Sequence, residues 1–584
     1  MKKHIIIYPT VALAFLSAGA QTLSEEVVID RDITPVERPV VRPSWLMPAL
    51  LTPGIEKTRL SFKEYMDAAE ITRSISPLEP VAWGDSVMRS PYAGYASIGY
   101  FPTYNLDVSA GYRFIRRKNL NVGAHLSYDG STWGGYSDAT SRYSRNKIAV
   151  GADVTAVFAP GTLKADLHYS WSATATAQYP HLYHRGTQAL NNVALDLSWT
   201  PSHIGRFGWD IKGNFGFGGF SSEKTDNLQG LLSLTNVRFK PLSDITFGIT
   251  SDLSLRLGST VDFVVGLGAD VRHVSDFRYV DPVAYTELGG VYEKLGVEAV
   301  SAGSRTLGIF TVRPGFKFAS SKFNGRVGLR VDFNSGGWQK DTHVAPEVDL
   351  NWAANNFFAL RLQATGREVM NTNTQLWERN PWMTGTLACE RSHINADIQL
   401  NAVFGSYKGF WAVLNGGLSS VSNWVSPVLL ERVNIWARMN EFTGFNYGLE
   451  LGYAWRDKLV VTGHAKGVSH GKYYRWQDNA SWAFDIAAKV SPIENLQIDL
   501  GYEVRIDRRG YVLSPVIVEA EPAFFATTSS LGDTSNLFVG ANYRITPQLS
   551  AFLKGENLLN HHWFITSNIR SQGIHGLAGV QYLF

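Results

Sequence analysis

The sequence predicts an all-β fold, a transmembrane antiparallel β-barrel of about 22 strands with a short proline-rich N-terminal segment. Three observations predict it. Apolar and polar residues alternate over many long segments, short turns alternate with long loops, and the chain ends on an aromatic residue. Because successive side chains of a strand point to opposite faces, each alternating segment has one apolar and one polar face.

Composition narrows the possible functions. Of the 584 residues, 18% are charged and 12% are aromatic, against about 25% charged residues in typical soluble domains. The formal net charge of +3 gives no electrostatic basis for nucleic acid as a partner. A single cysteine, Cys389, excludes an intramolecular disulfide and a cysteine-cluster metal site.

The first 20 residues read as an export signal. Lys2 and Lys3 precede an apolar stretch over residues 5–16, and Ala18-Gly19-Ala20 follows it. This pattern is typical of a secretory signal peptide, so we expect cleavage before Gln21.

Residues 21–90 form the next predicted segment, which is periplasmic or lumenal. Seven prolines make much of it extended or turning: Pro35, Pro39, Pro43, Pro48, Pro53, Pro77 and Pro80. A short helix is expected over residues 61–73, with Ser61 as its N-cap.

The barrel itself is expected over residues 91–584. Residues 393–404 and 495–507 alternate over about 11 to 13 positions, whereas soluble strands usually have about five or six residues. A tilted membrane-spanning strand needs about 9–11. Their polar faces carry full charges of both signs, which suits a water-filled lumen and would be costly in a sandwich core.

Short and long connections alternate along this region. Turns such as Ala159-Pro160-Gly161 and Thr546-Pro547-Gln548 are short, whereas residues 131–144, 173–185 and 369–384 are expected to be long loops. This is the layout of outer-membrane barrels. An even number of strands closes such a barrel, and about 22 fit the available length. Between residues 225 and 303, however, the expected strands do not return the chain to the barrel edge at which the next strand must start.

The last strand carries the expected assembly signal. Val580, Tyr582 and Phe584 share one face, and Phe584 ends the chain. This resembles the terminal strand that outer-membrane barrels present to the barrel assembly machinery.

Three short motifs resemble the TonB-dependent outer-membrane receptors. Residues 552–560 contain Asn557-Leu558-Leu559-Asn560, which is similar to the "Asn-Leu-Phe-Asp/Asn" segment of that family's penultimate strand. Asn380-Pro381-Trp382 is similar to its mid-barrel segment. Glu25, Glu26, Val27, Val28 and Ile29 resemble a TonB box, a stretch that would add as a strand to the energy-coupling protein.

The resemblance covers the barrel and not what precedes it. The family has a plug domain ahead of the barrel, and residues 21–90 show no plug-like series of strands and helices. The sequence therefore predicts a relative of these receptors without a plug domain. For the acidic and β-branched stretch, a working TonB box, a relic and an ordinary linker remain open.

No enzyme motif stands out, so we expect neither catalysis nor a cofactor or metal. Aromatic residues in the predicted loops are candidates for facing a ligand, with packing at the membrane interface as the alternative. These candidates are Trp133, Tyr136, Trp338, Trp377, Trp382 and Trp476.

The sequence thus predicts a Gram-negative outer-membrane protein that transports a nutrient or another small ligand, with porin-like or receptor-like character. The alternative is a scaffold subunit without transport activity. Expected partners are outer-membrane lipid, the assembly machinery, and TonB or other outer-membrane subunits.

Overall fold

The computed structural model describes most of the chain from residue 92 onward. The described residues are 92–102, 105–134, 142–177, 185–202, 205–222, 241–275, 278–286, 293–301, 303–337, 342–383, 389–406, 408–430, 433–438, 442–456, 458–470, 480–518, 521–567 and 569–584. The predicted signal peptide, proline-rich segment and TonB-box-like stretch lie outside them.

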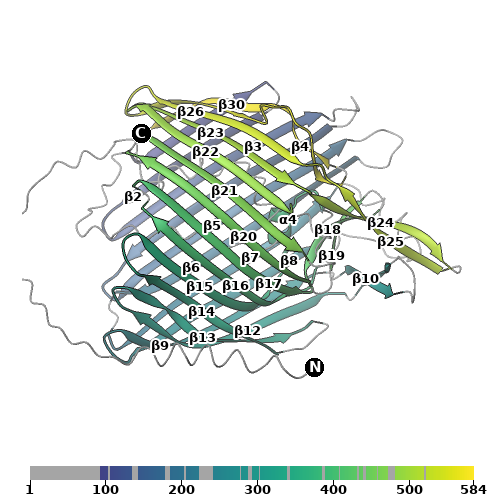
Figure 1. Ribbon diagram of the computed structural model, residues 1–584, viewed down its shortest axis with the longest axis horizontal. Coiled ribbons are helices and arrows are strands. Elements are labelled where there is room, and N and C mark those ends of the chain that lie inside the picture. Colours follow the sequence, from purple (N-terminus) through teal and green to yellow (C-terminus); the bar gives the residue numbers. More distant parts are fainter. Residues whose placement is uncertain are drawn as a thin grey trace, which may run out of the picture. The chain divides into compact units, whose positions relative to one another are not determined.

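Twenty-two antiparallel strands form one closed barrel (Figure 1). In ring order they are β1 (Gly94–Phe101), β2 (Asn105–Arg116), β3 (Leu120–Gly134), β4 (Arg142–Val157), β5 (Gly161–Ala177), β6 (Arg185–Pro201), β7 (Phe207–Ser222), β8 (Ser243–Arg256), β9 (Val261–Val274), β12 (Arg305–Ala319), β13 (Phe323–Ser335), β14 (Thr342–Ala353), β15 (Phe358–Val369), β16 (Ser392–Gly405), β17 (Phe410–Ser422), β20 (Phe442–Trp455), β21 (Leu459–His470), β22 (Trp482–Ile493), β23 (Leu496–Ile506), β26 (Thr534–Arg544), β27 (Leu549–Glu556) and β30 (His575–Leu583). β1 pairs with both β2 and β30, so the ring has no free edge. The predicted fold class and strand number are confirmed.

The outer face of the barrel is apolar. Large side chains such as Ile98, Leu400 and Ile486 are 52%, 47% and 55% exposed, and they point away from the lumen. Charged residues from the alternate positions line the inside, as the alternation predicts. A closed barrel with this outer face belongs in a lipid bilayer, because each wall strand pairs with a neighbour on both sides and the large side chains of the outer face are apolar. The chain is therefore an outer-membrane barrel.

The two edges of the barrel differ in their connections. At one edge, the short-turn edge, consecutive strands are joined by a few residues, as between Arg116 and Leu120 or between Val157 and Gly161. At the other, the long-loop edge, most connections are much longer. In bacterial barrels the short turns face the periplasm and the long loops face outward.

Several strands are longer than the sequence indicates. β5 and β6 each have 17 residues, and β3 and β4 stay paired as far as Gly134 and Arg142. Residues 131–134, 142–144, 173–177 and 185, which the sequence places in long loops, are therefore strand.

Three loop hairpins form a second sheet. They are β10 (Arg278–Thr286) with β11 (Glu293–Ser301), β18 (Val425–Leu430) with β19 (Val433–Arg438), and β24 (Arg509–Val518) with β25 (Glu521–Ser530). β11 pairs with β25, and β24 pairs with β18. The β10–β11 hairpin lies between β9 and β12 in sequence but is not part of the barrel wall. Its two strands are therefore not to be counted among the wall strands, which explains the mismatch in the strand count between residues 225 and 303. β28 (Phe564–Thr566) and β29 (Ile569–Arg570) make a separate small hairpin.

The family-like residues after β27 form a tight turn. Asn557 and Asn560 both have positive φ, 49° and 52°, a conformation that asparagine adopts more readily than most residues. The buried Asn557 side chain donates to the carbonyls of His561 and Gln572, both at 2.8 Å. The motif therefore ends the strand and fixes the loop that follows it.

Two neighbouring residues of β22 test which face of the wall contacts lipid and which faces the lumen. Ile486→Arg places a charge in lipid and should lower the free energy of unfolding by about 2–4 kcal/mol. Ala487→Arg, one residue on, points into the aqueous lumen and should change it little. Urea unfolding in lipid vesicles measures both, and equal losses would contradict the assigned faces.

Candidate functional site

The connection between β15 and β16 folds into the barrel. We call residues 370–391 the crossing segment, of which residues 370–383 and 389–391 are described. It contains α4 (Asn373–Arg379), a helix of 7 residues. No helix in the described part of the chain is long and apolar enough to cross a membrane.

The first turn of α4 is fixed by its own side chains. The Gln375 amide donates to Thr372 Oγ1 at 3.2 Å, and the Thr372 amide donates to Gln375 Oε1 at 3.2 Å. This reciprocal capping box satisfies two amides that a helix start leaves unpaired. So short a helix is marginal alone, and its remaining support comes from the barrel wall.

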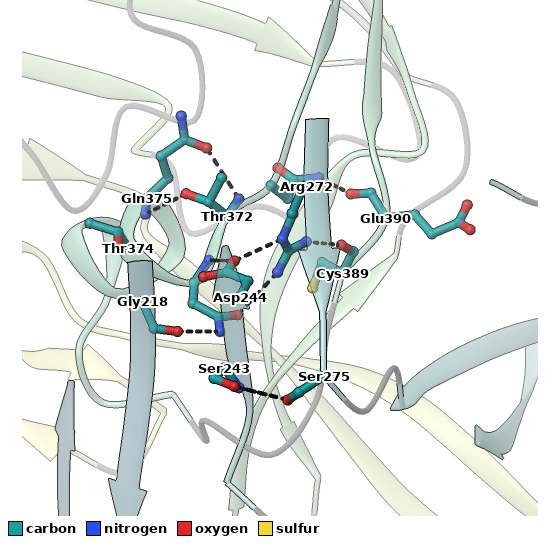
Figure 2. A network of polar contacts seen from close by, with 12 residues as sticks. Gly218, Ser243, Asp244, Arg272, Ser275, Thr372, Thr374, Gln375, Cys389 and Glu390 are labelled. Atoms are coloured by element: carbon teal, nitrogen blue, oxygen red, sulfur yellow. Dashed lines mark hydrogen bonds and ion pairs between the residues drawn. The ribbon is translucent and has the colours of Figure 1, made fainter. Parts of the chain in front are cut away.

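A buried ion pair of the wall holds the start of α4. Arg272 Nε of β9 donates to Asp244 Oδ2 of β8 at 2.7 Å, and their side chains are 0% and 2% exposed. The same carboxylate oxygen accepts the Asn373 amide at 2.8 Å. Arg272 also donates to the Asn373 side-chain oxygen at 3.1 Å and to the Cys389 carbonyl at 2.8 Å. Figure 2 shows the guanidinium between the Asp244 carboxylate and the Cys389 carbonyl.

A glycine of β7 allows the helix to approach the wall closely. Asn373 Nδ2 donates to the Gly218 carbonyl at 3.3 Å. A Cβ at Gly218 would lie 3.0 Å from Thr374 Oγ1 and 3.4 Å from the Asn373 side chain's Cβ. A larger side chain there that is not covalently bonded to the helix would therefore push α4 away from the strand.

The segment continues along the wall through further hydrogen bonds. Thr374 Oγ1 donates to Asn192 Oδ1 at 2.9 Å, and Trp377 Nε1 donates to Ser172 Oγ at 3.0 Å. Thr174 Oγ1 donates to the Pro381 carbonyl at 3.0 Å. The contacts with β5 and β6 therefore continue the line begun on β9, β8 and β7.

The segment then reaches the wall on the far side of the lumen from β15 and β16, the strands that it connects. The Trp382 ring lies 5.8 Å from that of Trp133 on β3 and 6.1 Å from that of Tyr143 on β4. In the ring of strands, β3 is ten strands from β15 by one route and eleven from β16 by the other. A chain that starts between β15 and β16 and touches β3 must therefore cross the lumen.

The crossing takes place near the long-loop edge. Asp244 is the second residue of β8, and Arg272 is the third from the end of β9, both at the long-loop ends of their strands. Trp133 is the penultimate residue of β3. The segment thus lies across the outward mouth of the lumen.

A second, apolar contact anchors the segment on the side of β18 and β19. Leu376, Met383, Cys389, Val425 and Trp436 form one buried cluster. The Arg379 guanidinium lies over the rings of Trp424 and Trp436, 5.0 Å and 4.8 Å from their centroids, and donates to the Val425 carbonyl at 2.9 Å. Burial lowers the pKa of Arg379 to about 10, which leaves it cationic at neutral pH.

Cys389 is a free and buried thiol within this cluster. Burial raises its pKa to about 12, while the positive charges of Arg272 and Arg379 act in the opposite direction. The thiol is therefore protonated at neutral pH and unreactive as a nucleophile.

Below the mouth, the lumen wall is charged with both signs, as the sequence indicates. Arg313 contacts Asp252 at 3.1 Å and Glu347 at 3.5 Å, and Arg326 contacts Glu347 at 3.4 Å. A recess of about 450 Å³ opens in the wall formed by β4 to β8. Its charged lining residues are Asp153, Lys164, Asp166, Asp196 and Lys212.

The candidate aromatic residues fall into two groups. Trp133, Trp377 and Trp382 all belong to the contact between the crossing segment and the wall, and Trp377 is only 5% exposed. Tyr136, Trp338 and Trp476 lie outside the described residues. Facing a ligand stays a prediction for the whole set.

The residues of the expected assembly signal point outward. Val580, Tyr582 and Phe584 are 46%, 45% and 47% exposed. The Phe584 ring stacks on Tyr112 at 6.0 Å, next to the seam between β1 and β30. Their role in assembly stays a prediction.

The sequence does not predict the crossing segment, because residues 369–384 have the composition of a long loop. The sequence does contain a local signal for its helix, since Thr372-x-x-Gln375 fits the capping-box pattern. Nothing local indicates that this helix turns inward. Among the described residues, no group of three or more His, Cys, Asp or Glu is placed to hold a metal ion.

Comparisons with known proteins support the fold assignment. No protein-family model and no curated protein sequence matches the chain. Among solved structures, the FrpB iron transporter of Neisseria meningitidis matches with a TM-score of 0.62 and 11% identity, over 85% of this chain and 82% of that one.

Two further solved structures match at similar levels. A variant of the ferric enterobactin receptor PfeA of Pseudomonas aeruginosa, in complex with enterobactin, matches with a TM-score of 0.57 and 12% identity, over 85% and 82% of the chains. The siderophore receptor PirA of Acinetobacter baumannii matches with 0.58 and 11%, over 85% and 81%. The expected resemblance to TonB-dependent receptors is thus confirmed at the level of the barrel fold.

The buried ion pair should control the stability of the crossing segment. Asp244→Asn leaves the Arg272 charge buried and uncompensated, which costs roughly 3–5 kcal/mol. Hydrogen exchange of the Asn373 amide should then accelerate at least about 100-fold. Asp196→Asn, which removes an exposed lumenal carboxylate, is the matched control, and equal exchange in both variants would show that the pair does not hold the segment.

The Cys389 thiol should report whether the segment is closed. In the intact protein at neutral pH we expect very slow maleimide labelling, because the thiol is buried and protonated. Asp244→Asn should increase the labelling rate, as the cluster opens with the segment. Rapid labelling of the unchanged protein would contradict the closed arrangement.

Proposed function

We propose that the barrel transports a small ligand across the outer membrane and that the crossing segment is its gate. The observation that supports this proposal is the passage of residues 370–383 from one wall of the lumen to the other at its outward mouth. A ligand that enters from outside meets this segment before it meets the charged lumen below.

The chemistry of the closed contact suits a gate. The segment meets β5 to β9 mainly through hydrogen bonds, and each contributes only about 1 kcal/mol net because water replaces it on opening. The Asp244–Arg272 pair can stay intact in the wall when the segment leaves. The open state is then hydrated on both sides, and its main cost is exposure of the Trp377 and Trp382 rings and of the cluster around Leu376.

The solved relatives make transport the favoured function. Their names describe an iron transporter, a ferric enterobactin receptor and a siderophore receptor, and their barrels resemble this one. On the same basis, residues 25–29 are proposed as the strand that would pair with a TonB-like coupling protein. The polar recess of the lumen wall is a place where a hydrophilic ligand could rest after passing the gate.

One observation favours the alternative, a scaffold subunit. The six-stranded sheet built from three long-loop hairpins is an extensive ordered structure at the long-loop edge. Sheets of this kind can pair with a partner's strand. In that case the crossing segment would be a fixed brace and the barrel would stay closed.

A disulfide across the contact distinguishes these functions. The Gly218→Cys/Asn373→Cys pair, made with Cys389→Ala, brings two Cβ atoms to the 3.4 Å given above, near the mean of about 3.8 Å for disulfides. In planar bilayers with potassium chloride, we expect openings from the reduced protein and none from the oxidised protein. Asn373→Cys with Cys389→Ala loses the same side-chain bonds without a crosslink and should conduct under both conditions.

Identical conductance of the oxidised and reduced pair would refute the gate. If every variant stays closed and an outer-membrane protein co-purifies in stoichiometric amount, the scaffold function replaces transport.

A further inference from the structure

The short-turn edge of the barrel carries an excess of positive charge. Its ten connections contain seven Lys or Arg and two Asp or Glu, namely Arg117, Lys118, Arg206, Lys322, Lys408, Arg456 and Lys458 against Asp457 and Glu494. The connections of the long-loop edge contain 15 basic and 18 acidic residues. The whole chain is nearly balanced, with 54 against 51, so the excess belongs to one edge. We call these seven cations the basic rim.

The rim cations lie at the surface of the short-turn edge. All seven are exposed, and none of them has an ion-pair partner among the described residues. The Arg456 guanidinium carbon lies 5.9 Å from the centroid of the Trp455 ring. Charges left unpaired in this way remain available to an external anion.

Outward aromatic residues beside the rim cations indicate how deep these cations lie in the membrane. Arg206 precedes Phe207, which is 58% exposed, and Lys408 lies two residues before Phe410, which is 59% exposed. Lys458 follows Trp455, which is 49% exposed. Outward aromatic rings sit at the level of the lipid headgroups, and long basic side chains at strand ends extend to the same level. The rim therefore lies at headgroup depth in the periplasmic leaflet.

The distribution around the barrel favours lipid over a protein partner. The cations occur in the turns β2–β3, β6–β7, β12–β13, β16–β17 and β20–β21, which are spread around the ring of 22 strands. A protein domain would contact one arc of the edge. A lipid annulus surrounds the whole circumference.

We propose that the basic rim binds the phosphate headgroups of anionic phospholipids in the periplasmic leaflet of the outer membrane. The lipid contributes a negative phosphodiester without a compensating amine, and the rim supplies the counter-charge. One Lys or Arg beside an anionic headgroup favours it about fivefold, so the effect averaged over all boundary lipids is smaller, roughly two- to threefold. This binding does not depend on whether the lumen conducts.

Electron spin resonance of spin-labelled lipids tests the proposal on the full chain in bilayers. The motionally restricted fraction gives the association constant of labelled phosphatidylglycerol relative to labelled phosphatidylcholine. We expect a preference for phosphatidylglycerol of roughly two- to threefold, which declines as added salt screens the charges.

Two variants with equal loss of charge locate the binding. Lys118→Gln/Lys408→Gln/Lys458→Gln removes three rim cations and should bring the preference close to one. The control, Lys164→Gln/Lys212→Gln/Lys489→Gln, removes three cations from the lumen face and should keep the full preference. Thermal unfolding of each variant confirms that it is folded.

Two results would overturn the proposal. One is an equal preference in the rim variant and the lumen variant, which would place the lipid selectivity elsewhere. The other is no preference for phosphatidylglycerol in the unchanged protein, together with loss of a stoichiometric periplasmic protein from the rim variant. That result would make the rim a protein-docking surface.

Discussion

The pairing of backbone groups is the constraint on which the rest of this structure depends. Within a bilayer no water can satisfy an open strand edge, so the wall must close on itself. The contact of β1 with β30 provides that closure. Once the ring is closed, the alternation of side chains assigns apolar groups to lipid and charges to the lumen. The long connections must then fold inside or beyond the barrel, where their own polar groups can be paired.

The crossing segment shows what a polar interior makes possible. An apolar core would hold a short helix only through shape, whereas this wall offers a carboxylate, a guanidinium and several hydroxyl and amide groups. Asp244 serves two partners at once, because it neutralises Arg272 and accepts the first amide of α4. The helix is thus positioned by directional bonds to three neighbouring strands, β7, β8 and β9. The apolar cluster around Leu376 supplies the part of the contact that is not directional.

The sequence predicts the wall of this protein well and its interior poorly, for one physical reason. Residues 495–507 and 393–404 alternate locally, and they correspond to β23 and β16. The signal that a strand faces lipid on one side is present within the strand itself. Arg272 and Asn373, by contrast, are 101 residues apart, and neither has a local pattern that indicates its partner.

The same reasoning explains the aromatic residues. Trp377 and Trp382 stand in a stretch with loop-like composition, and only the tertiary structure shows that both contact the opposite wall. The capping box at Thr372 predicts a helix start but not its direction. The β10–β11 hairpin cannot be told from wall strands for a related reason. A strand in a loop sheet and a strand in the wall are built from residues with the same preference for extended backbone.

The seam between β1 and β30 also has a consequence for biogenesis. β1 pairs with β30, and Asn105 at the start of β2 donates to the Gly576 carbonyl across 471 positions of sequence, so the ring closes only when β30 joins strands that precede it by far in the chain. Until then, the first strand has one unsatisfied side, and such a side is a template for aggregation. The exported chain must therefore be shielded for the whole of its passage through the periplasm. A chain without β30 would be an open sheet and not a smaller pore.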